Sequence, residues 1–484
     1  MKNIVNYKEF EKEYDGKSFI ALGRELYMDL ETPVSIFLKV SNGANSFLLE
    51  SVEGGESIAR YSFIGIGGYE KFDSGNSGSG FKNPLNLVSD LLDNINVVKP
   101  EWMERFFGGL IGYISYDAVK YFDNIKLPND QGLNLPEACF LFVKDFLVYD
   151  HLKHKLLIIS YADCSKGNSR EVYESTYKKI DDIQNRLNSQ PNNLQNPNFE
   201  NQFQKDSENI SKTEFIEKVK EIKRYIEDGE IIQAVFSRRI SKKTDVHPFM
   251  IYRTLRSLNP SPFMYYLDFD DHYIVGASPE LLVQVENENI TSVPIAGTRP
   301  RGLTELEDKE IEKELIADPK ENAEHIMLVD LARNDVGKVS EPGTVAVTEF
   351  MDIKKFSHVM HIVSKVIGKK KEDISALEVF QSCFPAGTVS GAPKIRAMQL
   401  ISELENDKRG PYAGAIGFFD FFDNLEVAIT LRTLFIKNGI ASVQSGGGIV
   451  YDSIPELEFE EHLHKIEALL KAIEMAEKGE FLFK

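Results

Sequence analysis

The sequence Asp318-Pro-Lys-Glu321-Asn-Ala-Glu324-His325-Ile-Met-Leu-Val-Asp330-Leu-Ala-Arg333-Asn334-Asp335 combines a helix start with spaced carboxylates. Asp318 suits the N-cap position, Pro319 the first helical position and Glu321 the acidic position of a capping box, so we predict that a helix begins here. Glu321 and Glu324 are three residues apart and therefore project from one helical face. On spacing alone, such a pair is most often part of a solvated helix face.

A second Glu-x-x-Glu-His set near the C-terminus changes the interpretation of the first. Glu458-Phe-Glu-Glu461-His462 follows Pro455 and precedes a helical pattern. If the two helices face each other, four carboxylates approach one point, and oxygen donors without cysteine suit a hard divalent cation such as Mg²⁺. The two sets together predict a Mg²⁺ site, and the alternative remains two solvated helix faces.

Length and charge restrict the class of protein. The chain has 484 residues, which is long for one hydrophobic core, and its formal net charge is −19,. This charge disfavours nucleic acid or an anionic membrane as the main partner. Three widely separated cysteines indicate neither a disulfide framework nor a structural zinc site,. Because no window approaches the roughly 18 apolar residues of a membrane span, we expect a cytoplasmic protein.

The composition divides the chain in three. A stretch rich in Asn and Gln, residues 187–210, is predicted to be a linker or surface loop between an N-terminal region, 1–186, and a C-terminal region, 211–484,. Short β-branched and aromatic runs occur in both regions, and long helical patterns separate groups of such runs. This order favours an α+β fold over alternating βαβ units. Three runs between Tyr412 and Ser445 are close enough to form an antiparallel meander,.

A glycine run near the C-terminus is a candidate anion site. Gln444-Ser-Gly446-Gly447-Gly448 follows a predicted strand, and glycine backbone N–H groups can approach a carboxylate without interference from Cβ atoms,. A β-bulge or tight turn is an equally good interpretation of the same run. Arg432, on the preceding predicted strand, can offer a bidentate fork to the same carboxylate, although a solvent-facing arginine is commoner.

Two Gly-Thr turns and two acid–base candidates complete the set. Gly297-Thr298 and Gly387-Thr388 each offer an N–H and an O–H to a ligand oxygen,. Glu280 and His361 are the candidates for proton transfer, although a lone histidine among apolar residues is more often a packed core residue.

Together these motifs resemble the chorismate-utilising enzymes, most closely the synthase subunits (component I) of anthranilate synthase, over nearly the whole chain. The segments 294–302, 318–335, 386–394 and 444–448 occur in the order that this family has. The resemblance implies two large, mainly antiparallel β-sheets packed as a sandwich with helices on the outside. It also implies Mg²⁺, with Glu324 and Glu461 as principal ligands and Glu321 and Glu458 beside them.

The resemblance further implies roles for other residues. Glu280, His361 and Thr388 form the implied catalytic set. Contacts with chorismate are implied for Gly297, Thr298, Tyr412, Arg432, Gly446, Gly447 and Gly448.

Two positions indicate which reaction the pocket supports. Water-using relatives have a lysine where this chain has Gln233, and a neutral amide cannot activate water,. The aminodeoxychorismate branch typically has a nucleophilic lysine where this chain has Ala296,. Amination by ammonia with loss of pyruvate, giving anthranilate, therefore remains as the expected reaction.

The resemblance also implies feedback inhibition and a partner. Ser51, in Leu48-Leu-Glu50-Ser51, and Pro260-Ser261-Pro262 resemble elements that bind L-tryptophan; without the resemblance they are a strand end and a turn,. Because no cysteine lies in a glutaminase nucleophile motif, we expect ammonia from a separate glutamine amidotransferase subunit (component II), in a heterotetramer of two subunits of each kind,. The alternatives are aminodeoxychorismate synthase component I and a non-catalytic amino-acid-sensing subunit.

Overall fold

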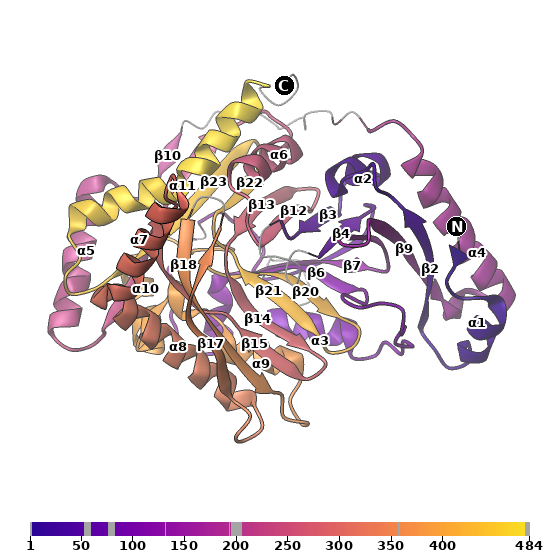
Figure 1. Ribbon diagram of the computed structural model, residues 1–484, viewed down its shortest axis with the longest axis horizontal. Helices are drawn as coiled ribbons and strands as arrows, with labels where there is room; N and C mark the ends of the chain where they lie inside the picture. Colours follow the sequence, from indigo (N-terminus) through magenta and orange to yellow (C-terminus); the bar gives the residue numbers. More distant parts are fainter. Residues whose placement is uncertain are drawn as a thin grey trace.

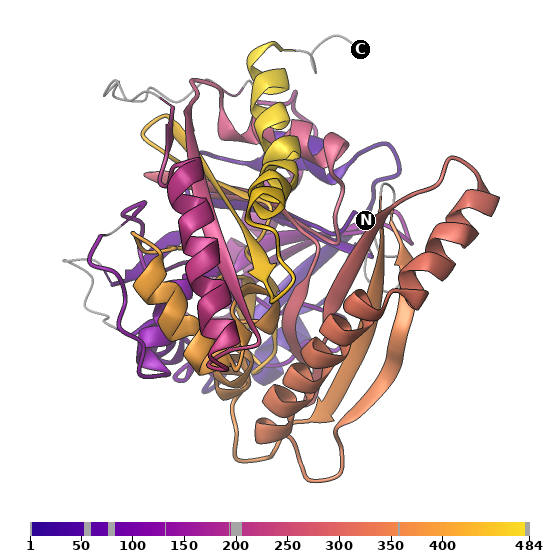
Figure 2. The ribbon, with the colours of Figure 1, turned by 90° about the vertical axis from the view of Figure 1, so that its left-hand side faces the viewer.

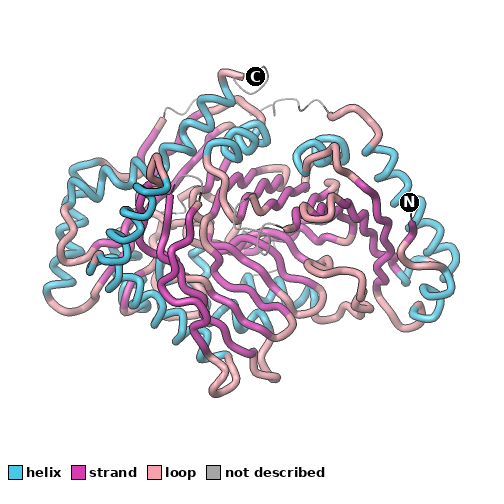
Figure 3. The backbone as a smooth tube through the Cα atoms, viewed as in Figure 1, coloured by secondary structure: helices cyan, strands magenta, loops and turns pink. Residues whose placement is uncertain are grey.

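Two antiparallel β-sheets packed face to face occupy the centre of the molecule, and helices surround them (Figures 1 and 3). The structure is a computed structural model that describes residues 2–52, 60–75, 83–130, 132–192, 194, 206–356 and 359–479. The predicted α+β fold class, with two antiparallel sheets as a sandwich and helices outside, is confirmed.

The larger sheet has thirteen strands among the residues that the structure describes. Along its path they are β1 (Lys2–Asn3), β2 (Phe19–Tyr27), β9 (Lys155–Asp163), β8 (Asp145–Asp150), β4 (Tyr61–Gly65), β3 (Ser46–Glu50), β12 (Phe263–Asp268), β13 (His272–Ser278), β22 (Thr433–Lys437), β23 (Ile440–Ile449), β11 (Gln233–Lys243) and β10 (Ser207–Glu208), with β19 (Gly391–Ala392) paired to β11.

In the described part of the chain, the smaller sheet has ten strands. In order they are β16 (Ile295–Pro300), β18 (Val359–Lys369), β15 (Asn289–Ser292), β14 (Leu281–Glu286), β21 (Leu425–Ile429), β20 (Ala415–Asp420), β6 (Gly109–Ile114), β7 (Ala138–Val143) and β5 (Glu70–Ser74), with β17 (Ala346–Lys355) paired to β18.

Helices cover the outside of the sandwich. In Figure 2, α7 and α8 run beside the long hairpin of β17 and β18, while α5, α10 and α11 lie over the end formed by β11 and β23. The helices are α1 (Tyr7–Glu13), α2 (Pro33–Val40), α3 (Pro84–Leu92), α4 (Ser169–Leu187), α5 (Lys212–Glu227), α6 (Pro248–Leu258), α7 (Glu305–Ala317), α8 (Pro319–Val339), α9 (Ala376–Cys383), α10 (Lys394–Leu404) and α11 (Pro455–Glu477), with short 3₁₀ turns at Tyr116–Tyr121, Cys164–Lys166 and Gly387–Val389.

Aromatic rings join the two sheets. Phe63 of β4 packs edge-on against Phe418 of β20, with ring centroids 6.0 Å apart, and Phe106 contacts both rings. All three are buried. Since aromatic side chains bury large apolar areas and prefer such edge-to-face contacts, this cluster stabilises the packing of an N-terminal strand on a C-terminal strand.

The N-terminal and C-terminal regions share both sheets. Strands before residue 187 form one side of each sheet, and strands from β10 onward form the other. The division into 1–186, 187–210 and 211–484 stays a prediction about the chain. The helix α4 ends at Leu187, where the linker was expected to begin, and β10 lies inside the expected linker. Residues 193 and 195–205 lie outside the described residues.

The helix α8 begins where the sequence predicts, at Asp318-Pro319, but the predicted capping box does not form. Asp318 is the N-cap, and its side chain accepts hydrogen bonds from the N–H groups of Lys320 and Glu321. The Glu321 carboxylate does not return to the Asp318 N–H, which bonds to the Leu315 carbonyl instead. Arg299, from β16, binds Glu321 with an Nη1–Oε1 distance of 2.9 Å. A tertiary ion pair has therefore replaced the local capping contact.

The expected meander in the last third is wrong. The run from Leu425 to Ile436 forms two strands in different sheets: β21 pairs with β20 in the smaller sheet, and β22 pairs with β23 in the larger sheet. Thr430-Leu431-Arg432 makes the crossing between them. Strand periodicity could not reveal the crossing, because both halves are apolar and β-branched.

Candidate active site and inter-sheet cavity

The N-terminal turns of α8 and α11 lie on either side of the glycine run in β23. Gln233 donates from Nε2 to Glu324 Oε1 at 2.9 Å, and the same amide lies against Gly448. Glu458 Oε2 lies 3.1 Å from the position that a Cβ would occupy on Gly447. Because both glycines lack Cβ atoms, the carboxylates of the two helices can approach the same section of strand.

Each of the four glutamates of the predicted metal site has a protein partner. The partners are Arg299 for Glu321, Gln233 for Glu324, the Ser453 side chain for Glu458 and Lys465 for Glu461. Within the described ranges, no three His, Cys, Asp or Glu side chains are gathered closely enough to hold a metal ion. The assignment of the four carboxylates to an ion stays a prediction.

The chemistry of this set suits a cation. Burial raises the pKa of Glu458, and the neighbouring charge of Glu461 raises it further, which means that its negative charge is poorly compensated,. Glu321 Oε2 lies 3.2 Å from the Cβ position of Gly297, so α8 also brings a carboxylate against the Gly297-Thr298 segment. Oxygen donors alone, with nearby positions where glycine leaves space, fit Mg²⁺ better than a softer metal.

Glu280 and Thr388 meet in the structure. The Thr388 hydroxyl lies 3.1 Å from Oε1 and 3.2 Å from Oε2 of Glu280, and a small cavity of about 40 Å³ adjoins both side chains. Burial raises the pKa of Glu280 to about 8, although the Thr388 hydrogen bond, the Ile295 N–H and the charge of Arg432 each lower it,. Glu280 is therefore a carboxylic acid that keeps its proton at neutral pH.

His361 lies on β18, directly opposite Thr298 of β16. Its Nδ1 lies 3.0 Å from the Thr298 hydroxyl and 3.0 Å from the Gly297 carbonyl. Burial lowers the pKa of His361 to about 4, and the charge of Arg432 contributes. The imidazole is therefore neutral at pH 7. An Nδ1–H that donates to the Gly297 carbonyl would leave Nε2 as an acceptor for a substrate proton.

The sequence pattern predicts Arg432 on a strand, and this prediction is wrong. Arg432 sits in the crossing between β21 and β22 with φ of 48°, a left-handed conformation that is uncommon outside glycine and asparagine,. Its guanidinium shifts the pKa values of both Glu280 and His361. The crossing between the two sheets therefore places one cation beside both acid–base candidates.

The glycine run lies inside β23 and forms no turn or bulge of its own. Gly446, Gly447 and Gly448 pair in register with Ser237, Phe236 and Val235 of β11. The ladder with β22 ends at Val443, so the other edge of β23 is left for other groups. Lys465 donates to the Gly446 carbonyl at 3.0 Å, and the Tyr412 hydroxyl lies 2.7 Å from the Cβ position of Gly446.

Arg299 and Lys465 are two site residues that the sequence motifs did not indicate. Arg299 follows Thr298 and binds Glu321; Lys465 follows Glu461 by one helical turn and pairs with it at 2.8 Å. The i, i+4 spacing of Glu461 and Lys465 was a usable signal for their ion pair. Nothing in the sequence indicated that Arg299, twenty-two residues before Glu321, would reach it.

The two specificity positions border this site. Gln233 begins β11, is buried and holds Glu324. Ala296 lies at the register shift of β16, next to Gly297, whose φ is 65°. A positive φ favours glycine, and the shift turns the chain at the Gly297-Thr298 pair. Both positions therefore adjoin residues that are predicted to bind the substrate or the metal ion.

A separate cavity of about 710 Å³ lies between the two sheets. Ser51 and Pro262, two of the predicted inhibitor residues, line it, and so does Met264. The Ser51 hydroxyl is buried without a hydrogen-bond partner in the described part of the chain. Ser261 supports the wall, because its carbonyl accepts the Val52 N–H at 3.3 Å. Pro260 is the neighbour of Ser261 and is not among the residues that line the cavity. A cavity of this size is typical of small-molecule sites.

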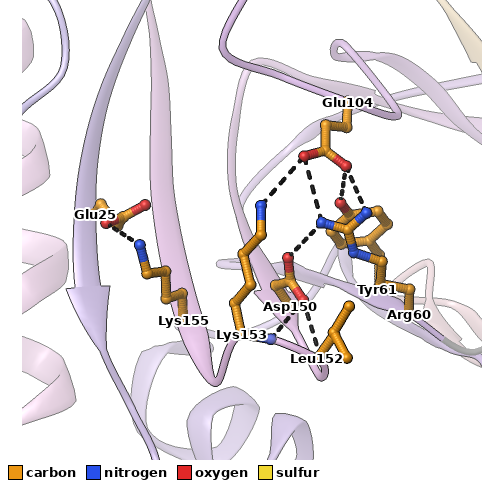
Figure 4. Close-up of polar contacts among 8 residues, drawn as sticks. All are labelled: Glu25, Arg60, Tyr61, Glu104, Asp150, Leu152, Lys153 and Lys155. Atoms are coloured by element: carbon orange, nitrogen blue, oxygen red, sulfur yellow. Dashed lines mark hydrogen bonds and ion pairs between the residues drawn. The ribbon is translucent and has the colours of Figure 1, made fainter. Parts of the chain in front are cut away.

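An adjacent cleft of about 290 Å³ shares Tyr61 and Arg105 with this cavity. Figure 4 shows its polar wall: Arg60 lies between Glu104 and Asp150, while Lys155 pairs with Glu25. The Tyr61 hydroxyl donates to Glu104. In these contacts Arg60, Glu104 and Asp150 serve as ion-pair partners for one another.

The fold and the site define a class of enzyme. Residues 44–471 match the family described as chorismate binding enzyme, and the chain belongs to this family.

Within the family, this chain is similar to proteins named anthranilate synthase component 1. Anthranilate synthase component 1 of Acetivibrio thermocellus is 44% identical over 96% of this chain and 97% of its own length. The corresponding proteins of Aquifex aeolicus and Pseudomonas aeruginosa are 43% and 40% identical, each over 98% of this chain and at least 99% of the relative.

Two solved structures have a similar fold. Anthranilate synthase component I from Streptococcus pneumoniae superposes with a TM-score of 0.74 at 33% identity, and the match covers 92% of this chain and 99% of that chain. The menaquinone-specific isochorismate synthase from Escherichia coli has a TM-score of 0.72 at 16% identity, and the match covers 96% of this chain and 98% of that chain. This second likeness is one of fold alone.

Among the described helices, none has both the length and the apolar run that a membrane crossing requires.

Proposed function

We propose that this protein is the synthase component of an anthranilate synthase, which converts chorismate and ammonia to anthranilate and pyruvate in the first committed step of tryptophan biosynthesis. The relatives named anthranilate synthase component 1, at 40–44% identity over nearly the full chain, support the reaction. The observation that carries the chemistry is the buried, protonated Glu280, held by Thr388 beside Arg432.

Glu280 acts as the general acid in the first step. Ammonia forms a bond to C2 of chorismate, the ring double bonds shift, and the C4–O bond breaks as the Glu280 proton leaves with the hydroxyl as water. The new ammonium group then releases one proton, which balances the proton that Glu280 gave up. A carboxylic acid with a pKa of about 8 holds this proton at neutral pH, whereas an exposed glutamate has already lost it,. The Thr388 hydroxyl fixes the orientation of the carboxyl group.

His361 assists the second step, in which pyruvate is eliminated. The C2 proton leaves, the C3–O bond to the enolpyruvyl group breaks, and the ring becomes aromatic. A neutral imidazole with a pKa of about 4 is available to accept a proton at pH 7,. Its hydrogen bonds to Thr298 and Gly297 orient the ring toward the substrate side of β16.

The substrate's two carboxylates require local positive charge in a protein of net charge −19. Arg432 offers a fork at the sheet crossing, and Lys465 lies at the Gly446 carbonyl on the open edge of β23,. Gly297, Thr298, Tyr412 and the run Gly446–Gly448 form the remaining surface. Fixed donors that need no reorganisation are the main source of charge stabilisation in such sites.

Chorismate-binding enzymes are metal dependent, and we propose that the ion here is Mg²⁺. Glu324 and Glu461 would be its principal ligands, with Glu321 and Glu458 beside them. When bound, Mg²⁺ neutralises negative charge on the ring carboxylate as the hydroxyl leaves. Arg299 pairs with one oxygen of Glu321 and Lys465 with one oxygen of Glu461, so each carboxylate would have its second oxygen to offer the ion.

Two residues favour anthranilate over the products of related enzymes. Gln233 is neutral and donates to Glu324, so it cannot activate a water molecule. Ala296 provides no nucleophile beside Gly297, which disfavours the aminodeoxychorismate route. The intact acid–base pair and Arg432 disfavour a non-catalytic sensing subunit.

Ammonia comes from a partner in this proposal. The name component 1 of the relatives implies a second component. We propose that it is a glutamine amidotransferase subunit, in a heterotetramer with two subunits of each kind, in the cytoplasm. L-Tryptophan would bind in the inter-sheet cavity at Ser51 and Pro262, with Pro260 and Ser261 shaping the wall, and inhibit the reaction.

One assay tests the proposal. The purified chain is given chorismate, Mg²⁺ and ammonium at alkaline pH, and anthranilate is followed by fluorescence together with pyruvate release. We expect both products with ammonium and no turnover with glutamine alone. Formation of isochorismate, or of an aminated product that retains its pyruvyl group, would exclude the proposed reaction.

A further inference from the structure

His462 is a buried side chain that the proposed chemistry does not use. Its exposed fraction is 0%, and neither ring nitrogen has a hydrogen-bond partner among the residues that the structure describes. Leaving a buried polar group unpaired is energetically unfavourable, because the group has lost its hydrogen bonds to water. Such a group in a folded protein therefore calls for a functional or structural explanation.

The surroundings leave the imidazole without a polar partner. Phe215 of α5 packs against the ring edge-on, with centroids 4.9 Å apart. Every protonation state of an imidazole side chain carries at least one N–H donor. His462 therefore has a donor to offer.

The geometry relates this donor to one carboxylate. His462 follows Glu458 by four residues on α11, so both side chains lie on the same helical face,. A Cβ on Gly447 would lie 2.9 Å from His462 Nε2 and 3.1 Å from Glu458 Oε2. The two atoms are therefore no more than 6.0 Å apart, the sum of these distances. The missing side chain of Gly447 leaves the space between them open.

We propose that His462 is a positioning residue for Glu458: its Nε2–H donates a hydrogen bond to one carboxylate oxygen and directs the other toward the bound divalent cation. The inference rests on the proposed Mg²⁺ site. Metal-binding carboxylates are usually oriented by a hydrogen-bond donor behind them, and removing such a donor typically weakens metal binding 10- to 100-fold. A rotation of the Glu458 side chain closes the remaining distance and gives the buried Nε2–H a hydrogen-bond partner at the same time.

The test measures metal binding without substrate. Mg²⁺ is titrated calorimetrically into the full-length chain and into His462→Gln, His462→Asn and His462→Phe. Glutamine can place its amide where Nε2 lies, whereas asparagine reaches only to the position of Nδ1. We expect His462→Gln to bind Mg²⁺ within about twofold of the wild type, and the other two variants to bind about tenfold more weakly.

The Glu458→Gln background separates a positioning role from a packing role. If His462 acts through Glu458, His462→Asn causes no further loss of Mg²⁺ affinity once Glu458 is replaced. Thermal unfolding in EDTA shows whether each variant is folded. Equal affinity in the wild type and His462→Asn, or equal weakening in the Asn and Gln variants, overturns the inference while the Mg²⁺ site stands. Absence of Mg²⁺ binding by the wild type overturns both.

Discussion

The Thr388 hydroxyl lies within hydrogen-bond distance of both carboxylate oxygens of Glu280, at 3.1 and 3.2 Å. The two residues are 108 positions apart in the sequence, and the contact joins a 3₁₀ turn after α9 to the start of β14. Because this hydrogen bond stabilises the ionised carboxylate, it limits how far burial can raise the pKa of Glu280,. The pair therefore sets the pH range over which Glu280 can deliver a proton.

Replacing Thr388 by valine is expected to move the alkaline limb of the pH profile upward. In the wild type, kcat/KM should fall as the pH rises through about 8, because Glu280 loses the proton that it must donate. Thr388→Val removes a contact that lowers the pKa of Glu280, so the fall should begin at a higher pH. The profile is measured at constant free ammonia. An unchanged limb in Thr388→Val, or a wild-type limb that persists in Glu280→Gln, would contradict the assignment.

In the wild type, the free energy of unfolding is expected to fall as the pH rises, and Glu280→Gln is expected to remove this pH dependence. The folded protein holds the Glu280 proton up to about pH 8, whereas the unfolded chain releases it near 4.5. The stabilising contribution is therefore complete below pH 4.5 and is lost as the pH rises to about 8. At about 1.4 kcal/mol per pKa unit, the loss reaches several kcal/mol. Urea unfolding of the wild type and of Glu280→Gln at pH 5 and pH 8.5 measures this loss. An equal pH dependence of the free energy of unfolding in the two proteins would refute the prediction.

Glu324→Ala and Glu461→Ala are each expected to lower activity at least 100-fold, and raising the Mg²⁺ concentration should recover part of it. Each variant removes one principal ligand, so the ion binds more weakly and the ring carboxylate loses its counter-charge. Glu460→Ala is the matched control, because Glu460 lies on the same helix and is exposed. Anthranilate formation is followed over a Mg²⁺ titration. Full activity in either ligand variant would remove the metal-site assignment.

Arg432→Lys is expected to raise the KM for chorismate about tenfold, because lysine keeps the charge but not the bidentate fork. Arginine and lysine are equally strained at a φ of 48°. The comparison of the wild type with Arg432→Lys therefore separates substrate recognition from backbone strain. Arg432→Gly, which relieves the strain and removes the charge, should unfold at a similar or higher temperature and have a still higher KM. Steady-state kinetics and thermal unfolding decide the case; a KM unaltered in Arg432→Lys would show that the fork does not bind substrate.

Ser51→Phe is expected to weaken tryptophan binding by more than tenfold, because the added ring fills part of the 710 Å³ cavity beside Ser51. Binding is measured by calorimetry, and inhibition is expressed relative to the uninhibited rate of the same variant. Ser189→Phe, at an exposed position after α4, serves as the control. Wild-type turnover that is insensitive to millimolar tryptophan would refute the regulatory role of the cavity.

Much of the local structure was predictable from short-range patterns. The Asp318-Pro319 start of α8 and the Pro455 start of α11 follow from capping preferences that act within one helical turn,. The α+β fold class followed from the grouping of strand-like and helix-like runs. The four glutamates, Glu280 and His361 were also identifiable as chemical candidates, because residue type alone decides which groups can bind a cation or move a proton.

The sequence by itself therefore determined the elements, the fold class and the inventory of reactive groups. Only the tertiary structure decided that the chain crosses between sheets at Arg432 and that Thr388 meets Glu280. It also decided that the Glu321 carboxylate pairs with Arg299 and does not return to the Asp318 N–H. The physical reason is the range of the interactions. Caps and periodicity depend on neighbours within a few residues, whereas sheet pairing, burial and the pKa shifts that follow from burial depend on groups up to hundreds of residues away.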